Sequence, residues 1–491
     1  MPNNLARRLS TSDAAFLYLE RPNAPLHIGS LGIYQGRLPY ENVASHIEER
    51  LPAIPRYRQR LAFVPFNLLH PTWEDDPKFD IRKHVIRVSP PSPLTDEQLT
   101  ELSTELFEKP LDRAKPLWEM YVIDNVEGDR SAIVSKVHHC LVDGVSGIEL
   151  LMATLDISPE CAPPPEATAW EPSSLPNPAA RLADAFWDQL AQQTRLLEEW
   201  QETFIDPIAR LRRTQDLLRS LSLASPWLLL PAPRTPFSKW LGSKRRAAFS
   251  EMSFVEIREI RTTLGGTVND VVLAILAGAL GRYLASHDHK VDGLELRVAV
   301  PVNVRMEEEQ GALGNRVSCM LITLPMGERD PVQRLNTIKE RQTQLKESNQ
   351  AGGLEQLMRM ASNVPAPIQA LAAASPTLNT AVNLICTNVP GPMIPLYCVG
   401  HLMLGHYPMV PLSMNMGLGV GVTSYNQRLY FGLMVDPDAV PDVDRLKFFL
   451  DESALELRNA AGVTTTDLPT LGGNGSGQNG AVGVEKIATR D

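Results

Sequence analysis

The feature that most constrains how this chain can fold is a long segment without charged side chains. Between Arg359 and Arg428 the sequence contains no Asp, Glu, Lys or Arg. In water such a segment must be largely buried, yet its many prolines and glycines exclude a membrane-spanning helix. Two interpretations are open: the segment forms an ordinary core sheet, or it forms the wall of an apolar tunnel.

Length and charge set the broad class of the protein. The chain has 491 residues, which is long enough for two sizeable hydrophobic cores. Its 43% hydrophobic and 21% charged residues are typical of a globular protein. The net charge of −10 argues against nucleic acid as a partner, because phosphate binding needs a large basic surface.

Cysteine usage and the N-terminus bear on the compartment. The five cysteines, at positions 140, 161, 319, 386 and 398, are odd in number and scattered, which favours free thiols in a reducing environment. The N-terminal arginines are not followed by an apolar region, so we expect a cytosolic protein. No window offers about 18 apolar residues without Pro, His or charge, so a spanning helix is not expected, although binding to a membrane surface stays open.

The residues best suited to chemistry lie in one short segment. A run rich in β-branched residues, Ala132 to Val137, precedes His138 and His139, and glycines follow, so the sequence predicts a strand that leads into a turn. Side chains alternate along a strand, so the two histidines point to opposite faces. His139 projects from an apolar face, where a neutral imidazole can accept a proton from a hydroxyl group. We therefore take His139 as the candidate general base.

Three neighbours complete the predicted catalytic group: His138, Asp143 and Gly144. Asp143 could orient an imidazole or clamp the loop by pairing with an arginine, and Gly144 allows backbone angles closed to other residues. His138, on the opposite face, is expected to be structural.

A core histidine, a metal site and a serine hydrolase are weaker interpretations of this segment. A lone histidine on an apolar face is often a core residue. A histidine pair can indicate metal, but adjacent strand histidines diverge, and no second Cys/His cluster stands at ligand spacing, so we expect no metal. The run Gly144 to Gly147 lacks the final glycine of a nucleophile elbow, which disfavours a serine hydrolase.

The segment from His138 to Gly144 matches the HHxxxDG motif of the CoA-dependent acyltransferase superfamily, which includes chloramphenicol acetyltransferase and peptide-synthetase condensation domains. The surrounding sequence resembles the bacterial wax ester synthase/diacylglycerol acyltransferase family, whose S-x-x-D-x-x-F-L-like opening is matched between Ser10 and Leu17. In that family the second histidine of the motif is taken as the base. The resemblance therefore implies the same role for His139.

Further segments carry the resemblance. Pro116-Leu117-Trp118 matches the PLW motif, which is thought to lie by the substrate path, although a Pro and Trp that fix a core strand explain it equally well. Asn269 and Asp270 match the ND motif and are candidates for holding the site shut, with Thr267 or Asn269 as helix cap. Arg305, in a V-P-V-x-x-R segment, is the candidate partner of Asp143, since a buried carboxylate needs a charged donor. The late loop Asn388 to Pro392 matches N-V-P-G-P.

The middle and the end of the chain differ in composition from the rest. Residues 156–178 are rich in Pro and Ala, and residues 180–220 carry an apolar stripe with several arginines, which predicts amphipathic helices. Such a stripe could pack on the protein or bind an anionic membrane or lipid droplet. The basic turn Lys244 to Arg246 could meet CoA phosphates or be a solvated turn. The tail after residue 460 is expected to be disordered.

The resemblance implies an α/β fold with mixed sheets, in two chloramphenicol-acetyltransferase-like domains with an active-site tunnel between them. The expected divisions are residues 1–155 for the domain with the histidine motif, 156–246 for the connector, 247–460 for the second domain and 461–491 for the tail. The charge-free segment would then be a candidate wall of an acyl tunnel.

The implied reaction is transfer of a long-chain acyl group from acyl-CoA to diacylglycerol, with no cofactor beyond the co-substrate and no acyl-enzyme. Alternatives are a wax ester synthase that uses long-chain alcohols, an acyltransferase for another lipid, and a non-catalytic lipid-surface protein. We expect a cytoplasmic protein that could be peripheral on the inner face of the membrane or on lipid droplets.

Overall fold

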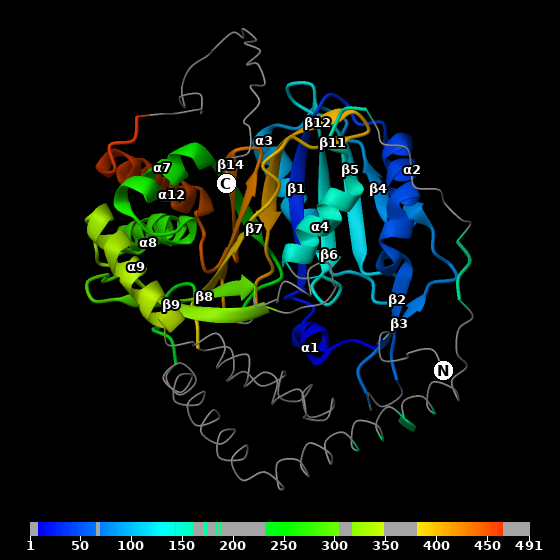
Figure 1. Ribbon diagram of the computed structural model, residues 1–491, viewed down its shortest axis with the longest axis horizontal. Helices are drawn as coiled ribbons and strands as arrows, with labels where there is room; N and C mark the ends of the chain where they lie inside the picture. Colours follow the sequence, from blue (N-terminus) through cyan, green and yellow to red (C-terminus); the bar gives the residue numbers. More distant parts are fainter. Residues whose placement is uncertain are drawn as a thin grey trace, which may run out of the picture.

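The computed structural model shows two α/β halves side by side, each built on one large sheet (Figure 1). It describes residues 8–64, 69–142, 144–160, 170–173, 231–303, 317–347, 381–413 and 415–464, with residues 183, 186, 187, 190 and 194. Asp143, Arg305, most of the amphipathic connector and the tail after residue 464 lie outside the described residues, so the predictions made for them are not tested.

The first sheet has six strands in the order β11-β12-β1-β6-β5-β4. All pairs in it are antiparallel except β4 with β5. Its central strands are β1 and β6; His138 is the last residue of β6, and His139 follows it. The strands are β1 (His27–Gln35), β4 (Val85–Val88), β5 (Trp118–Val126), β6 (Arg130–His138), β11 (Tyr397–Cys398) and β12 (His401–Met409).

The second sheet also has six strands, in the order β7-β14-β13-β10-β8-β9. Strand β10 pairs in parallel with both β13 and β8, and the other pairs are antiparallel, so this sheet is mixed. A small third sheet joins β2 (Gln59–Ala62) and β3 (Thr72–Asp75). The strands of the second sheet are β7 (Arg246–Ser253), β8 (Glu295–Asn303), β9 (Val317–Pro325), β10 (Leu384–Val389), β13 (Leu418–Tyr425) and β14 (Arg428–Val435).

Helices cover both faces of the first sheet. Ile133 and Val137 pack in one core cluster with α1, α2 and α4, whereas Val134 packs in another with α3, as strand alternation predicts. In the second half α7, α8, α9 and α12 gather on one side of the sheet (Figure 1). The helices are α1 (Thr11–Leu19), α2 (Tyr40–Arg50), α3 (Asp96–Glu108), α4 (Gly144–Thr154), α7 (Phe254–Leu264), α8 (Val268–Ser286), α9 (Pro331–Glu347) and α12 (Val443–Ala460), with short 3-10 turns at Leu51–Ala53, Pro55–Arg58 and Ile81–Lys83.

Helix α8 is the centre of the second core. Its side chains from Val271 to Leu280 are almost completely buried, which its apolar sequence predicts. Thr267 caps it, with the reciprocal hydrogen bonds to Asp270 of a capping box. Within the described residues α8 alone is long and apolar enough to cross a membrane by length and composition, but 78% of its apolar window is buried inside the protein. It is therefore a core helix.

The charge-free segment, in its described residues 381–413 and 415–427, contributes strands to both sheets. Strands β10 and β13 belong to the second sheet, whereas β11 and β12 join the first sheet by pairing of β12 with β1. Every residue of β13 is buried. The core-sheet interpretation is thus confirmed for these strands. The tunnel stays a prediction.

Most predicted elements near the site are observed. The predicted strand Ala132 to Val137 is the centre of β6, and the predicted α/β class with mixed sheets is confirmed. Helix α4, directly after the histidine motif, was not predicted. The second domain was expected to begin at residue 247. Strands β11 and β12, within residues 397–409, come after that position in the chain but lie in the first sheet.

Candidate active site

His139 lies directly after β6, where the chain turns away from the sheet. Its backbone N–H donates to the carbonyl of Leu26 at 2.9 Å, which fixes the backbone of the turn against the residue before β1. The residue is partly exposed, but Nδ1 of its ring is buried, and the ring stacks on Phe16 of α1, with ring centroids 3.9 Å apart and an interplanar angle of 5°. One face of the His139 ring is therefore covered by Phe16 of α1.

His138 is buried, with 1% of its surface exposed. Its Nδ1 accepts a hydrogen bond from the backbone N–H of Cys140 at 3.1 Å. A ring nitrogen that accepts cannot carry the proton, so the neutral ring is protonated on Nε2. Nε2 lies 3.3 Å from Oε1 of Glu20. The two neighbouring histidines thus have different surroundings, as their opposite faces predict.

Glu20 follows α1 and is the negative centre of the site. Arg113 donates to its Oε2 from Nη2 at 2.6 Å and from Nε at 3.1 Å, and the N–H of Leu26 donates to its Oε1 at 3.0 Å. Burial by itself raises the pKa of this carboxyl, but the contacts with His138, Arg113 and Leu26 outweigh it and lower the pKa to about 2. Glu20 is therefore ionised at neutral pH.

Two more buried polar side chains lie beside the histidine pair. His27 of β1 is the register partner of His138, and its Nε2 donates to the carbonyl of Phe107. Lys136 of β6 donates from Nζ to the carbonyls of Leu106 at 3.1 Å and Lys109 at 2.8 Å, and Glu119 pairs with it at 3.0 Å. These contacts satisfy the last carbonyls of α3, which have no partner within the helix. They fix α3 against this end of the sheet.

The structure places the other motif residues as follows. Gly144 is the first residue of α4. Asp143 and Arg305 lie outside the described residues, so their pairing stays a prediction. Among the described residues no group of three or more His, Cys, Asp or Glu could hold a metal ion.

The PLW segment lies in the core. Pro116 and Leu117 are buried, and Trp118 is 1% exposed. The Trp118 ring stacks between Tyr57 and His84, at centroid distances of 4.5 and 4.7 Å. These contacts favour the core interpretation over a role in the substrate path.

The backbone of the PLW segment still reaches the site, because the carbonyl of Leu117 accepts the N–H of His138 at 2.9 Å.

The ND motif meets the late loop of the chain. The side-chain amide of Asn388 donates to Oδ1 of Asn269 at 3.4 Å, which joins the start of α8 to the end of β10. Asp270 is 4% exposed, and its Oδ2 accepts from the backbone and the hydroxyl of Thr267 at 2.7 and 2.8 Å. The ND motif therefore builds the N-terminal cap of the core helix. A role in holding the site shut stays a prediction.

The basic turn at Lys244 and Arg245 connects the two halves. Lys244 pairs with Glu108 at 2.9 Å, and the backbone N–H of Arg245 donates to the same carboxylate. The Arg245 guanidinium lies 3.5 Å from the buried carboxylate of Asp436, at the end of β14. Arg245 therefore forms its contacts within the protein. Neither the CoA-phosphate interpretation nor the solvated-turn interpretation of this turn predicted these contacts.

Three residues of the site were missed from the sequence: Phe16, Glu20 and Arg113. The segment from Ser10 to Leu17 carries the family resemblance, but the sequence predicts no role in the site for Phe16 or Glu20. Its only signal was that an apolar helix ends in a glutamate, four residues after an aromatic residue. Arg113 carried no local signal, because its contact with Glu20 joins segments far apart in the chain.

The fold of this chain is similar to that of solved condensation domains. The starter condensation domain of rhizomide synthetase superposes with a TM-score of 0.56 at 12% identity and covers 93% of this chain and 94% of its own. The first condensation domain of the calcium-dependent antibiotic synthetase gives 0.58 at 13% identity, over 94% and 97%. At these identities the fold alone is shared. It is the two-domain chloramphenicol-acetyltransferase-like fold expected from the sequence.

Sequence comparison gives the family. The model of the wax ester synthase/diacylglycerol acyltransferase catalytic domain matches residues 9–272, and the model of the C-terminal domain of the same family matches residues 313–458. The chain belongs to the wax ester synthase/diacylglycerol acyltransferase family and is an acyltransferase.

Individual relatives agree with this family. A Mycobacterium tuberculosis protein named as a candidate diacylglycerol O-acyltransferase, Rv1760, is 32% identical over 89% of this chain and 87% of its own. Another, tgs1 of the same organism, is 30% identical over 91% and 95%. The wax ester synthase/diacylglycerol acyltransferase of Marinobacter aquaeolei VT8 superposes with a TM-score of 0.66 at 25% identity, over 93% of this chain and 100% of its own.

Proposed function

We propose that this protein transfers a long-chain fatty acyl group from acyl-CoA to diacylglycerol and forms triacylglycerol, with His139 as the general base. The family and the names of its mycobacterial relatives support the reaction class and the acceptor. The observation that carries the role of His139 is the contrast within the pair. His139 is partly exposed and its ring stacks on Phe16, whereas His138 is buried beside Glu20.

In the proposed mechanism His139 removes the proton of the acceptor hydroxyl as its oxygen attacks the thioester carbonyl. The tetrahedral intermediate collapses, the carbon–sulfur bond breaks, and coenzyme A leaves as a thiolate that receives the proton from His139. The products are the ester and the thiol, and no acyl-enzyme forms. General base catalysis of this kind contributes ~10²–10⁴-fold to the rate.

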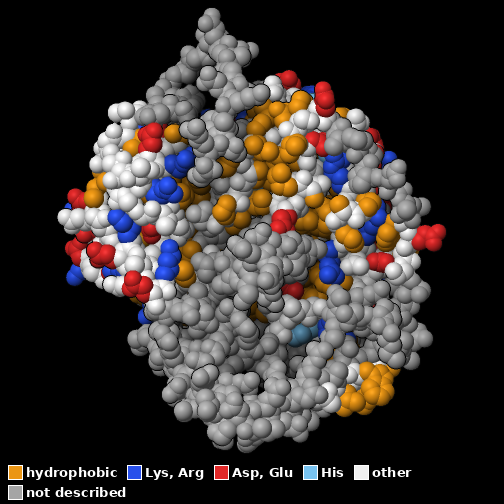
Figure 2. Space-filling model, in the orientation of Figure 1, with side chains coloured by type: hydrophobic (Ala, Val, Ile, Leu, Met, Phe, Trp, Pro, Cys, Tyr) orange, Lys and Arg blue, Asp and Glu red, His pale blue; other side chains and the backbone are white. Residues whose placement is uncertain are grey.

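The proposal also covers the co-substrate and the surface at which the enzyme meets its acceptor. Acyl-CoA is a co-substrate, and no cofactor is required. A cytoplasmic enzyme would meet diacylglycerol at a membrane or lipid-droplet surface, which needs exposed apolar side chains. In the connector Phe186 is 64% exposed, Trp187 62% and Leu190 41%. Figure 2 shows apolar side chains gathered near the upper centre of the molecule, and in β12 Leu404 is 42% exposed.

The deciding experiment measures thiol release from a long-chain acyl-CoA with diacylglycerol, with a fatty alcohol and without acceptor. We expect release that depends on an alcohol and is fastest with diacylglycerol. A faster reaction with the fatty alcohol would make the protein a wax ester synthase. No release with any acceptor would support the non-catalytic alternative.

His139→Ala tests the mechanism. We expect turnover to fall by ~10²-fold or more while the thermal unfolding temperature stays near that of the wild type, because the residue is partly exposed. His138→Ala is the comparison, and it should lower stability more than His139→Ala does, because it empties a buried site beside an ionised carboxylate. Near-normal activity of His139→Ala would contradict the mechanism.

A further inference from the structure

We infer that Glu20 is a positioning residue for His139, and that it acts through His138 and Leu26 with Arg113 as its anchor. The inference rests on the proposed function of His139 and adds a residue that positions this base. Glu20 has 9% of its side chain exposed, so it has little surface to offer a substrate. Its effect on the reaction must therefore pass through the residues that it touches.

The first connection runs through the backbone of one residue. Leu26 donates its N–H to Oε1 of Glu20 at 3.0 Å, and it accepts the N–H of His139 at its carbonyl at 2.9 Å. Leu26 thus joins the carboxylate of Glu20 to the backbone of His139. A displacement of the carboxylate is transmitted to the turn that carries the candidate base.

The second connection runs through the neighbouring ring. Oε1 of Glu20 lies 3.3 Å from Nε2 of His138, whose Nδ1 accepts the N–H of Cys140. The carboxylate favours a proton on Nε2, and this tautomer leaves Nδ1 free to accept from Cys140. The turn from His138 to Cys140 is therefore fixed on both sides of His139.

Helix α1 links the carboxylate to the ring of the candidate base. Phe16, which stacks on His139, accepts the backbone N–H of Glu20 at its carbonyl at 3.1 Å. The end of α1 thus supplies the ring clamp and the carboxylate together. Arg113 holds this end by donating to Oε2 of Glu20 and to the carbonyl of Leu17 at 2.9 Å.

A base that removes a proton must stay within hydrogen-bonding distance of the hydroxyl, and a displacement of about 1 Å can cost ~10²-fold in rate. The contacts of Glu20 are suited to this task because they restrain the backbone before and after His139. They also keep a buried negative charge paired with Arg113, so the site does not carry an unpaired ion.

Glu20→Gln is the sharpest test, because it keeps the shape of the side chain. Oε1 accepts from Leu26 and faces His138, and Oε2 accepts from Arg113. A glutamine amide has one acceptor and one donor end, so either orientation sets an NH₂ group against another donor. We expect kcat to fall by ~10- to 100-fold while KM for acyl-CoA stays within about two-fold, since the base is displaced and the substrate surface is unchanged.

The matched control is a similar pair far from the histidines in the chain. Arg341 donates to both oxygens of Glu295 and to the carbonyl of Thr323, whereas Arg113 donates twice to Oε2 of Glu20 and to the carbonyl of Leu17. Glu295→Gln should leave kcat and KM within about two-fold of the wild type. Thermal unfolding of both variants shows whether each is folded.

Arg113→Lys is the second variant, for the case that Glu20→Gln does not accumulate as folded protein. Lysine keeps the charge but cannot donate in a fork to Glu20 and Leu17 together, so we expect kcat to fall by about three-fold or more with KM unchanged. Arg341→Lys is its control.

The outcomes separate this inference from the proposed function. If the wild type releases no thiol with any alcohol, the proposed function fails. If the wild type is active, the inference is overturned by an unchanged kcat in the folded variant, by a rise in KM with unchanged kcat, or by loss of folding in both variants while both controls fold. The last outcome would make Glu20 a residue of stability alone.

Discussion

The three histidines at this end of the first sheet differ from one another because their surroundings differ. His139 is partly exposed and stacked on Phe16, His138 is buried beside an ionised glutamate, and His27 is buried against the end of α3. Burial and the nearby ammonium of Lys136 lower the pKa of His27 to about 3. His27 is therefore neutral in the folded protein at neutral pH.

This pKa predicts how acid affects stability. In the unfolded chain a histidine binds its proton near pH 6.5, whereas folded His27 does so only near pH 3, so stability is lost as pH falls from about 6.5 towards 3. At pH 5 the loss from His27 amounts to about 2 kcal/mol. His27→Gln, which keeps a donor for Phe107, should lose about 2 kcal/mol less between pH 7 and pH 5 in urea unfolding. Equal losses in the two proteins would contradict this, and between pH 7 and 8 their pH slopes should agree.

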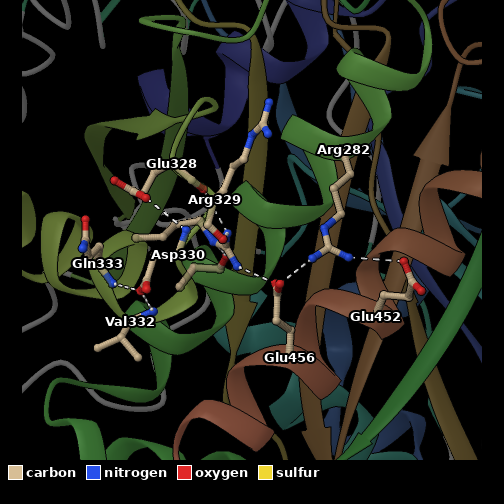
Figure 3. Close-up of polar contacts among 10 residues, drawn as sticks. Arg282, Glu328, Arg329, Asp330, Val332, Gln333, Glu452 and Glu456 are labelled. Atoms are coloured by element: carbon tan, nitrogen blue, oxygen red, sulfur yellow. Dashed lines mark hydrogen bonds and ion pairs between the residues drawn. The ribbon is translucent and has the colours of Figure 1, made fainter.

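At the scale of elements, a buried arginine joins three helices of the second half. Arg334 of α9 is 2% exposed and donates to the carbonyl of Ala274 in α8 and to that of Glu328, each at 3.0 Å. It also contacts Glu456 of α12 at 3.4 Å. Figure 3 shows Glu456 in contact with Arg282 of α8 as well, at 2.7 Å. The three helices are thus connected by the buried cation of Arg334 and by the more exposed ion pairs of Arg282, which form the rim of this network.

Arg334→Met should lower the free energy of unfolding by about 2–4 kcal/mol, because it leaves buried acceptors without their donor. The rim variant Arg282→Gln is the control. Its side chain is 35% exposed, so we expect a loss of about 1 kcal/mol or less. Urea unfolding of the two variants measures the difference, and a similar small loss in both would show that the buried arginine adds no more than a surface ion pair.

At the scale of the whole molecule, the two halves are joined by chain that crosses between them. Strand β12, from the second half of the sequence, pairs with β1 in the first sheet and lies against β14 of the second sheet. At this junction a side chain on Gly432 would begin 1.8 Å from the carbonyl oxygen of Pro408. The close approach of the two backbones therefore requires glycine.

Gly432→Ala should cost about 3 kcal/mol or more in stability and lower turnover, because one backbone must move away from the other. Gly242→Ala, beside Asp436 after the end of β14, is the control. There the nearest atom, a carboxylate oxygen of Asp436, is 3.5 Å from the added carbon, so a loss of about 1 kcal/mol or less is expected. Thermal unfolding and thiol release measure both effects, and equal behaviour of the two variants would contradict the close packing at Gly432.

Features whose signal lies within a few residues could be predicted from the sequence. Strand β6 with the histidine pair at its end, the opposite faces of His138 and His139, and the cap of α8, expected at Thr267 or Asn269 and found at Thr267, are examples. Each follows from a local pattern: a run of β-branched residues, the alternation of a strand, and a capping residue directly before an apolar run. The motif order also indicated the family.

Only the tertiary structure decided which distant segments meet. It placed Glu20 beside His138, Arg113 against Glu20, Trp118 in the core and β12 in the first sheet. These contacts join segments far apart in the chain, and they depend on how whole sheets and helices pack, not on the order of residues near each site. The sequence by itself thus determined the position of the histidine pair and the fold class, and packing determined what holds that pair in place.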